Sequence, residues 1–233
     1  TVQKKFEDRF HVPIFEGYGL TETTSFSCIN DFPANKRKNG SIGKPLITNE
    51  MVILDDNNNR VSIDEEGEIC IRGYNVMIGY LGLEQKNNQV FKNGWFHSGD
   101  YGRMDSEGYY YFHGRRDSLI IKGGENIYPA EIENILYKHP DIEECAIIGI
   151  PDKLRGEEIC AFIKIKENKT VSELFFKDFL VGKIADYKRP KKIIIINNLK
   201  DLKTIPKGPT KKILYRKLKE YYITNLTTIK NSE

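Results

Sequence analysis

Residues 17–24, with the sequence GYGLTETT, gather side chains that suit a nucleotide. The glycines on either side of Tyr18 let the backbone approach a ligand closely, and the tyrosine offers a flat aromatic face to a base. Thr21 supplies a hydroxyl for a phosphate oxygen, and Glu22 supplies a hard carboxylate of the kind that binds Mg²⁺. A glycine-rich turn that caps a helix has a similar composition, so this motif alone leaves both interpretations open.

Three further segments could take part in chemistry. The run 94–100 (GWFHSGD) ends in Asp100, which could accept two hydrogen bonds from a ribose diol or cap its own turn. Residues 114–133 are charged and contain glycines, so they suit either a hinge or a linker before a helix. Residues 205–214 hold two prolines and a glycine in an exposed turn, from which a lysine could contact phosphate oxygens or remain solvated.

The elements that must position these segments differ between the two halves of the chain. From residue 40 to about 111, short apolar strands such as 51–54, 68–72 and 109–112 are separated by turn-forming runs. That spacing predicts a small β-barrel or sandwich. Ahead of it, we expect a loop that leaves a short strand at 12–15.

After residue 115 the pattern predicts strands and helices in alternation, which indicates a compact α+β domain. The expected strands cover residues 119–121, 145–150, 159–165 and 193–196. The expected helices cover residues 130–138, 171–180 and 211–222, and Pro129 suits the first turn of the first one. We therefore place two domains at 1–114 and 119–233, with residues 115–118 as a hinge.

Composition and charge narrow the class of protein. Lys and Arg number 36 against 33 Asp and Glu, so the net charge is only +3 and nothing favours nucleic acid as a partner. The four cysteines form no CxxC pair and the four histidines show no metal spacing, as expected for reduced thiols in a cytoplasmic protein. No apolar run reaches the roughly 18 residues that a membrane helix needs.

The order of the motifs is more specific than any one of them. Residues 17–24 are followed by 67–80, which contain GEICIRG and VMIGY, and then by 94–100, 114–133 and 206–212. This order and spacing resembles the adenylate-forming (AMP-binding) superfamily, which includes acyl-CoA synthetases, peptide-synthetase adenylation domains and firefly-type luciferases. The resemblance runs from about Gly17 to Leu218. It implies an α/β and α+β fold: the end of a large AMP-binding domain with a small β-barrel subdomain, then a mobile C-terminal domain.

The resemblance also implies substrates and residue roles. The family joins a carboxylic acid to AMP with Mg-ATP and then passes the acyl group to a thiol, so ATP, Mg²⁺ and coenzyme A are implied. Tyr18 would stack on adenine, Thr21 would contact the α-phosphate and Glu22 would ligate Mg²⁺. Lys212 would join Thr21 and Glu22 as a catalytic residue that bridges the acyl carboxylate and the phosphate. The positions implied for ATP and AMP binding are Gly17, Tyr18, Gly19, Thr21, Asp100, Arg115 and Lys212, with Asp100 and Arg115 at the ribose.

A second set of roles concerns movement between two half-reactions. Asp117 matches the family's hinge position, about which the C-terminal domain would rotate from an adenylating pose to a thioester-forming pose. In the second pose Lys212 would leave the site, and Gly123 and Gly124 would line the path of the CoA pantetheine.

The chain departs from the family pattern in two places. The family usually reads Thr-Gly-Lys before the last helix, where residues 210–212 read Thr-Lys-Lys. The flanking residues favour Lys212 as the catalytic lysine, and Lys211 remains a rival. In addition, nothing in residues 1–17 resembles the family's phosphate loop. We therefore expect this chain to be a C-terminal fragment that cannot form acyl-adenylate alone.

These observations favour an acyl-CoA ligase of the EC 6.2.1 type for a fatty or aryl acid, because residues 123–133 look most like those synthetases. One alternative is an adenylation ligase that serves a carrier protein. Another, from a different class, is a non-catalytic remnant that binds a nucleotide or a partner. The acid and the oligomeric state are not indicated.

Overall fold

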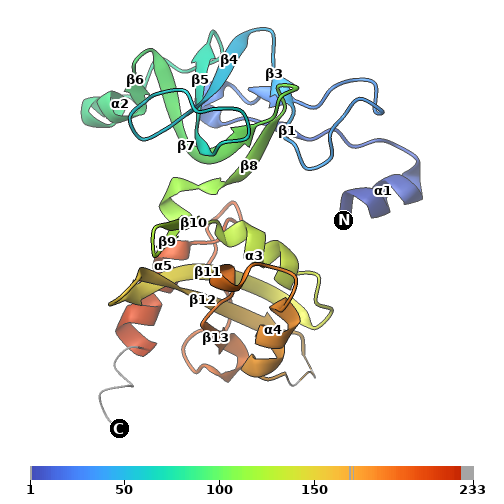
Figure 1. The fold of residues 1–233 in the computed structure, drawn as a ribbon, viewed down its shortest axis with the longest axis vertical. Coiled ribbons are helices and arrows are strands. Elements are labelled where there is room, and N and C mark those ends of the chain that lie inside the picture. The colour runs from blue at the N-terminus through green and yellow to red at the C-terminus, as the bar shows by residue number, and fades with distance from the viewer. Residues whose placement is uncertain (1, 168, 170, 227–233) are drawn as a thin grey trace. The chain divides into compact units, whose positions relative to one another are not determined.

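The structure is a computed structural model that describes residues 2–167, 169 and 171–226. The chain divides into two compact units, Thr1–Arg116 and Asp117–Glu233 (Figure 1). The division lies inside the segment 115–118 that the sequence assigned to a hinge.

The first unit is built from two antiparallel sheets and two helices. Helix α1 (Val2–Phe10) comes first, and α2 (Glu84–Val90) follows the fifth strand. The smaller sheet has the order β1-β2-β3, formed by Gly17–Tyr18, Cys28–Ile29 and Lys44–Pro45. The larger sheet has the order β4-β5-β7-β6, with β8 paired to β7. Its strands are β4 (Asn49–Leu54), β5 (Gly67–Gly73), β6 (Phe91–Lys92), β7 (Trp95–Met104) and β8 (Tyr110–Arg115).

The larger sheet curls, which confirms the expected barrel-like subdomain in the form of a half-barrel (Figure 1). Two residues of β5, Glu68 and Cys70, pair with Tyr101 and His97 of β7, so β7 carries extra residues between the two pairs. Such a bulge bends a strand and leaves local backbone groups unpaired. Gly99 lies within this bulge at φ +72°, a left-handed conformation that favours glycine.

The strand expected at 12–15 is wrong. These residues form no strand, and the first strand begins at Gly17. The reason is local, because Pro13 has no N–H to offer a ladder. The backbone of Ile14 is instead bonded to side chains: its N–H donates to Glu7 at 2.8 Å, and its carbonyl accepts from Arg37 at 2.5 Å.

The second unit is a sheet with helices on both faces (Figure 1). Its sheet has the order β10-β9-β12-β11, with β13 parallel to β12. The strands are β9 (Ile120–Lys122), β10 (Glu125–Ile127), β11 (Ile142–Asp152), β12 (Gly156–Ile165) and β13 (Lys192–Ile195). The helices are α3 (Pro129–Leu136), α4 (Glu173–Leu180) and α5 (Tyr215–Tyr221).

Alternation along β11 and β12 explains why both faces are covered. Cys145 and Ile147 pack into one buried cluster with α3 and α4, whereas Ala146 and Ile148 pack into another with Leu218 of α5. Side chains of successive strand residues point to opposite faces, so a continuous apolar run buries both. The predicted strands and the first two predicted helices are confirmed within a few residues of their expected ends.

The second unit differs from expectation in two places. Strand β10 is not among the expected strands, and residues 123 and 124 form the turn that leads from β9 into it. The last helix does not begin at residue 211 but at Tyr215. Residues 207–213 close a small loop instead, with Lys207 bridged to Ile213 and the Leu214 N–H donated to the Pro206 carbonyl at 2.9 Å.

Among the described residues, no helix is long and apolar enough to span a bilayer. The four cysteines are buried and unpaired, which agrees with the absence of a CxxC pattern.

Candidate functional site

Three of the residues implied for nucleotide binding meet through the carboxylate of Asp100. The Tyr18 hydroxyl donates to Asp100 Oδ2 at 2.6 Å, across 82 residues of sequence. Arg115, the cross-strand partner of Asp100, places Nη1 3.6 Å from Oδ1. Burial and the charge of Asp100 raise the pKa of Tyr18, so the hydroxyl keeps its proton and acts as a donor. Asp100 is only 3% exposed in the described structure.

The aromatic ring and the glycines around it have structural partners. The Tyr18 ring lies 6.3 Å from the Phe112 ring in a stacked arrangement. At Gly19, a Cβ would lie 1.6 Å from the Ser25 carbonyl oxygen, so the loop itself requires glycine there. Gly17 is exposed, and a Cβ there would touch the Phe26 ring at 3.0 Å. Close backbone approach is therefore needed for the loop's own packing, and the stacking of Tyr18 on adenine stays a prediction.

Glu22 lies in a short 3-10 helix, Thr21–Thr23, whose first residue is exposed. The Tyr80 hydroxyl donates to Glu22 Oε1 at 2.8 Å. Burial and this carboxylate raise the pKa of Tyr80 to about 12. A carboxylate oriented by a neutral donor on one oxygen, and with no further hydrogen bond to its side chain among the described residues, suits a hard cation such as Mg²⁺.

A pocket of about 350 Å³ lies in the first unit, beside Glu22 and Arg115. Glu22, Tyr80, Gly99 and Arg115 line it, whereas Tyr18 and Asp100 are not part of its wall. Three further cations, Lys86, Lys92 and Arg116, also line it, against the carboxylates of Glu22 and Glu68. Arg115 and Arg116 already have carboxylate partners outside this lining, Asp100 and Asp56. Lys86 and Lys92 are therefore the cations best suited to an anionic ligand such as a polyphosphate.

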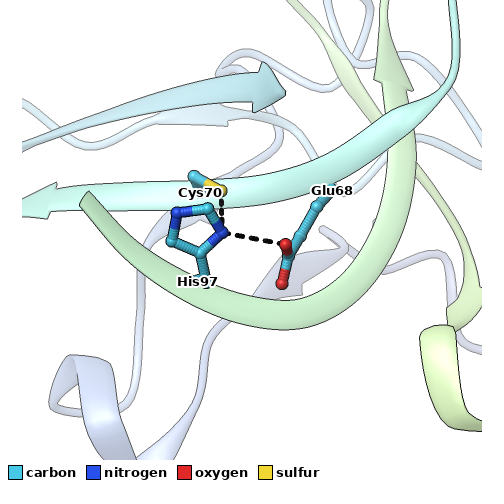
Figure 2. A group of neighbouring side chains, drawn as sticks. All are labelled: Glu68, Cys70 and His97. Atoms are coloured by element: carbon cyan, nitrogen blue, oxygen red, sulfur yellow. Dashed lines mark hydrogen bonds and ion pairs between the residues drawn. The ribbon is translucent and has the colours of Figure 1, made fainter. Parts of the chain in front are cut away.

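Glu68 and His97, which line this pocket, form a group with Cys70 that the sequence did not reveal (Figure 2). His97 Nδ1 lies 2.9 Å from Glu68 Oε2 and 3.4 Å from Cys70 Sγ. The other oxygen of Glu68 accepts the Gly99 N–H at 2.8 Å. Burial would raise the pKa of Glu68, but the bonds from His97 and the Gly99 amide outweigh it and hold the pKa below its ordinary value.

These three side chains are also of the types that bind metals, and their ligand atoms lie within 4.8 Å of one another. Both Glu68 oxygens, however, already accept hydrogen bonds inside the protein. We therefore interpret the group as a hydrogen-bonded support. Strand alternation could have placed Glu68 and Cys70 on one face, but no local pattern indicates that His97 pairs with Cys70.

In the second unit, Gly123 and Gly124 form the exposed turn between β9 and β10, at φ +61° and +90°. Nothing lies within 4 Å of a Cβ built on either glycine, so both faces of the turn are open. The Gly123 N–H donates to the Arg155 carbonyl at 2.9 Å. Asp117 is exposed within a 3-10 turn at the first residue of the unit.

Backbone conformation distinguishes Lys211 from Lys212 in the loop of residues 207–213, the lysine loop. Lys211 has φ +61°, a conformation in which glycine is favoured and other residues are strained. It thus occupies the position where the family pattern has glycine, which supports the assignment of Lys212 as the lysine of that pattern. The loop closes through a hydrogen bond from the Gly208 N–H to the Lys212 carbonyl at 2.9 Å, and the Lys212 side chain is exposed.

The fold is that of adenylate-forming enzymes. The AMP-binding enzyme family model matches residues 1–81, and the model of the AMP-binding enzyme C-terminal domain matches residues 131–205. The chain belongs to this family. The resemblance inferred from the motifs is therefore confirmed.

Individual relatives agree with the family match. A probable CoA ligase of Humulus lupulus is 37% identical over 231 residues, which are 99% of this chain and 43% of the relative. The o-succinylbenzoate CoA synthetase of Bacillus subtilis, solved with an acyl-adenylate intermediate, is 37% identical with a TM-score of 0.83, over 92% of this chain and 43% of that one. The same synthetase with ATP and magnesium gives a TM-score of 0.81 at 37% identity, again over 92% of this chain and 43% of that one. This chain thus spans less than half the length of the relatives that it matches.

Proposed function

We propose that the protein carrying this chain is an ATP-dependent acyl-CoA ligase, which activates a carboxylic acid as acyl-AMP and transfers the acyl group to the CoA thiol. The observation that carries the proposal is that Tyr18 and Arg115, from separate motifs, both contact the carboxylate of Asp100. The carboxylate of Glu22 lines a pocket together with Arg115 and three further cations, which adds support. Relatives named CoA ligases support the acceptor thiol.

In this proposal the first unit holds the nucleotide. Asp100 accepts the ribose hydroxyls with Arg115 beside it, Thr21 contacts the α-phosphate, and Tyr18 stacks on the adenine. Glu22 ligates Mg²⁺, which supplies positive charge to the phosphate oxygens. The cations of the pocket wall attract the remaining phosphate charge, because fixed positive groups focus an anionic ligand.

The second unit supplies one group for each half-reaction. Lys212 offsets the negative charge that gathers on the phosphorus oxygens and acyl carboxylate during adenylation. The turn at Gly123 and Gly124, which has no side chains, leaves room for the pantetheine arm during thioester formation. Rotation about Asp117 would replace Lys212 at the site with the turn at Gly123 and Gly124. Each half-reaction would then have its own arrangement of groups around the substrate.

The proposal is tested with the complete gene product that contains these residues. ATP–pyrophosphate exchange is measured over a panel of carboxylic acids, and acyl-CoA is then measured with CoA present. Exchange together with acyl-CoA supports the ligase. Exchange without acyl-CoA would indicate a different acceptor, such as a carrier protein, and no exchange with any acid would favour a non-catalytic binding role.

The Glu22 assignment gives a sharper prediction. Glu22→Gln keeps the hydrogen bond from Tyr80 but removes the charge of the ligand, on which the affinity for a hard cation depends, so we expect the Mg²⁺ concentration for half-maximal exchange to rise on the order of tenfold or more. Tyr80→Phe is the matched control, because it keeps the carboxylate and should shift the Mg²⁺ requirement much less. An unchanged Mg²⁺ titration in a folded Glu22→Gln variant would remove Glu22 from the metal site.

We also propose a cytoplasmic location. Four buried, unpaired thiols suit a reducing compartment, where cysteines stay reduced. Fractionation of cells with an antibody against the chain tests it, and recovery in an oxidising compartment would contradict it.

A further inference from the structure

The bulge of β7 around Gly99 is held by two side chains, that of Glu68 from the neighbouring strand β5 and that of Ser98 from β7 itself. Because β7 carries extra residues between its pairs with Glu68 and Cys70, its amides there lack regular ladder partners. The Gly99 N–H donates to Glu68 Oε1 at 2.8 Å, and the Asp100 N–H donates to Ser98 Oγ at 3.0 Å. Two successive amides are thus held by side chains.

The two supports are themselves anchored. Ser98 donates its hydroxyl to the Ile69 carbonyl at 2.6 Å. The second oxygen of Glu68 is held by His97 Nδ1 at 2.9 Å, so the carboxylate cannot turn away from the Gly99 amide without losing that bond (Figure 2). Both Glu68 and Ser98 are 8% exposed and His97 is 9% exposed, so water competes little for these contacts.

The direction of the Asp100 side chain depends on this bulge. Between His97 and Tyr101, β7 has three residues opposite the single residue Ile69 of β5, so the regular alternation of side chains is interrupted there. The left-handed Gly99 lies in the middle of this bulge, immediately before Asp100, and Glu68 accepts its amide. A hydrogen bond to a charged acceptor is roughly twice as strong as a neutral one, so a buried carboxylate is an effective clamp.

We propose that Glu68 is a positioning residue for ribose recognition: its carboxylate, oriented by His97, fixes the Gly99 bulge that directs Asp100 towards the nucleotide's 2′- and 3′-hydroxyls. The inference rests on the proposed function, in which Asp100 is the ribose ligand. Glu68 itself touches no substrate in this scheme.

The test compares the binding of ATP with that of 2′,3′-dideoxy-ATP, which lacks the ribose hydroxyls. Dissociation constants are measured by calorimetry with Mg²⁺ and no acid, on the complete gene product. We expect Glu68→Ala to weaken ATP about tenfold, the typical loss of a charged hydrogen bond, while dideoxy-ATP binding is unchanged. Glu68→Gln retains a carbonyl oxygen for the Gly99 amide and should keep most of the preference for ATP.

Two further variants complete the test. Asp100→Asn should abolish the preference for ATP, and adding Glu68→Ala to it should cause no further loss, because both act on one contact. Ser98→Ala removes the side-chain oxygen that accepts the Asp100 N–H. If Glu68→Ala does not fold, Ser98→Ala allows the same comparison between the binding of ATP and of 2′,3′-dideoxy-ATP. It should weaken ATP and not dideoxy-ATP.

The possible failures are distinguishable. If Asp100→Asn abolishes the preference but Glu68→Ala and Ser98→Ala keep it, the positioning role is wrong and the ribose assignment stands. Equal weakening of ATP and dideoxy-ATP by Glu68→Ala would also overturn the role. If Asp100→Asn keeps the preference, Asp100 is not the ribose ligand, and both the assignment and the inference fail.

Discussion

Lys212→Ala in the complete gene product is expected to slow acyl-adenylate formation by about 10²–10³-fold, the usual loss when one preorganised electrostatic contact is removed. Thioester formation from supplied acyl-AMP should stay close to the unsubstituted rate, because the lysine acts only while charge develops on the phosphate. The two rates are measured separately, by pyrophosphate exchange and by acyl-CoA release. Equal loss of both half-reactions in a folded variant would contradict the division of labour between the lysine loop and the glycine turn.

Lys211 provides the matched control for this experiment. Its φ of +61° is a glycine-like conformation, so Lys211→Gly relieves backbone strain and restores the Thr-Gly-Lys pattern of the family. We expect this variant to keep adenylation. A collapse of exchange in Lys211→Gly with normal exchange in Lys212→Ala would reverse the assignment of the two lysines.

Much of the fold could be predicted because its signals are local. The apolar runs that form β4, β5, β11 and β12 are bounded by turn-forming residues. Pro129 indicates the start of α3, because proline is favoured in the first turn of a helix. The motif residues were found for a similar reason. Each lies in a short run whose composition is unusual by itself, and the order of the runs identified the family.

The rest depends on contacts between distant residues. The bulge at Gly99 arises from how β7 pairs with β5, so the support that Glu68 gives to the Gly99 amide has no signature in either segment alone. The start of α5 moved for a comparable reason. Residues 211–214 have a composition typical of a helix. Their backbone forms a loop instead, because the Lys212 carbonyl accepts the Gly208 N–H and the Leu214 N–H donates to the Pro206 carbonyl. Tertiary hydrogen bonds overrode local preference in both places.

A buried ion pair is a further contact between distant residues, and it lies next to the turn formed by Gly123 and Gly124, the glycine turn. Lys122 Nζ lies 2.6 Å from Glu158 Oε1, and the two side chains are only 6% and 4% exposed. Lys122 also donates to the Tyr187 carbonyl at 2.9 Å. Because Gly123 follows Lys122 directly, this pair anchors one end of the turn proposed for thioester formation. Charges this deeply buried are compatible with folding only while each keeps its partner.

Removing one partner should therefore destabilise the second unit strongly. We expect Lys122→Met to lower its free energy of unfolding by about 3 kcal/mol, because the buried Glu158 then keeps, among the described residues, only the longer ion pair of Oε2 with Nη1 of the exposed Arg155, at 3.7 Å. Hydrogen exchange of the β11 and β12 amides reports the second unit, and Trp95, the single tryptophan, reports the first unit, which should not change. Arg216→Ala, which breaks an exposed ion pair on α5, is the control and should have little effect.

A double variant separates the lost charge balance from lost packing. Adding Glu158→Gln to Lys122→Met removes the buried carboxylate that has lost Lys122 and keeps the size of the side chain, so most of the stability should return. If the double variant is as unstable as the single one, packing of the lysine stem rather than charge pairing holds the turn. If Lys122→Met alone leaves exchange in β11 and β12 unchanged, the pair does not anchor the turn, and the geometry of Gly123 and Gly124 must come from the β9–β10 hairpin itself.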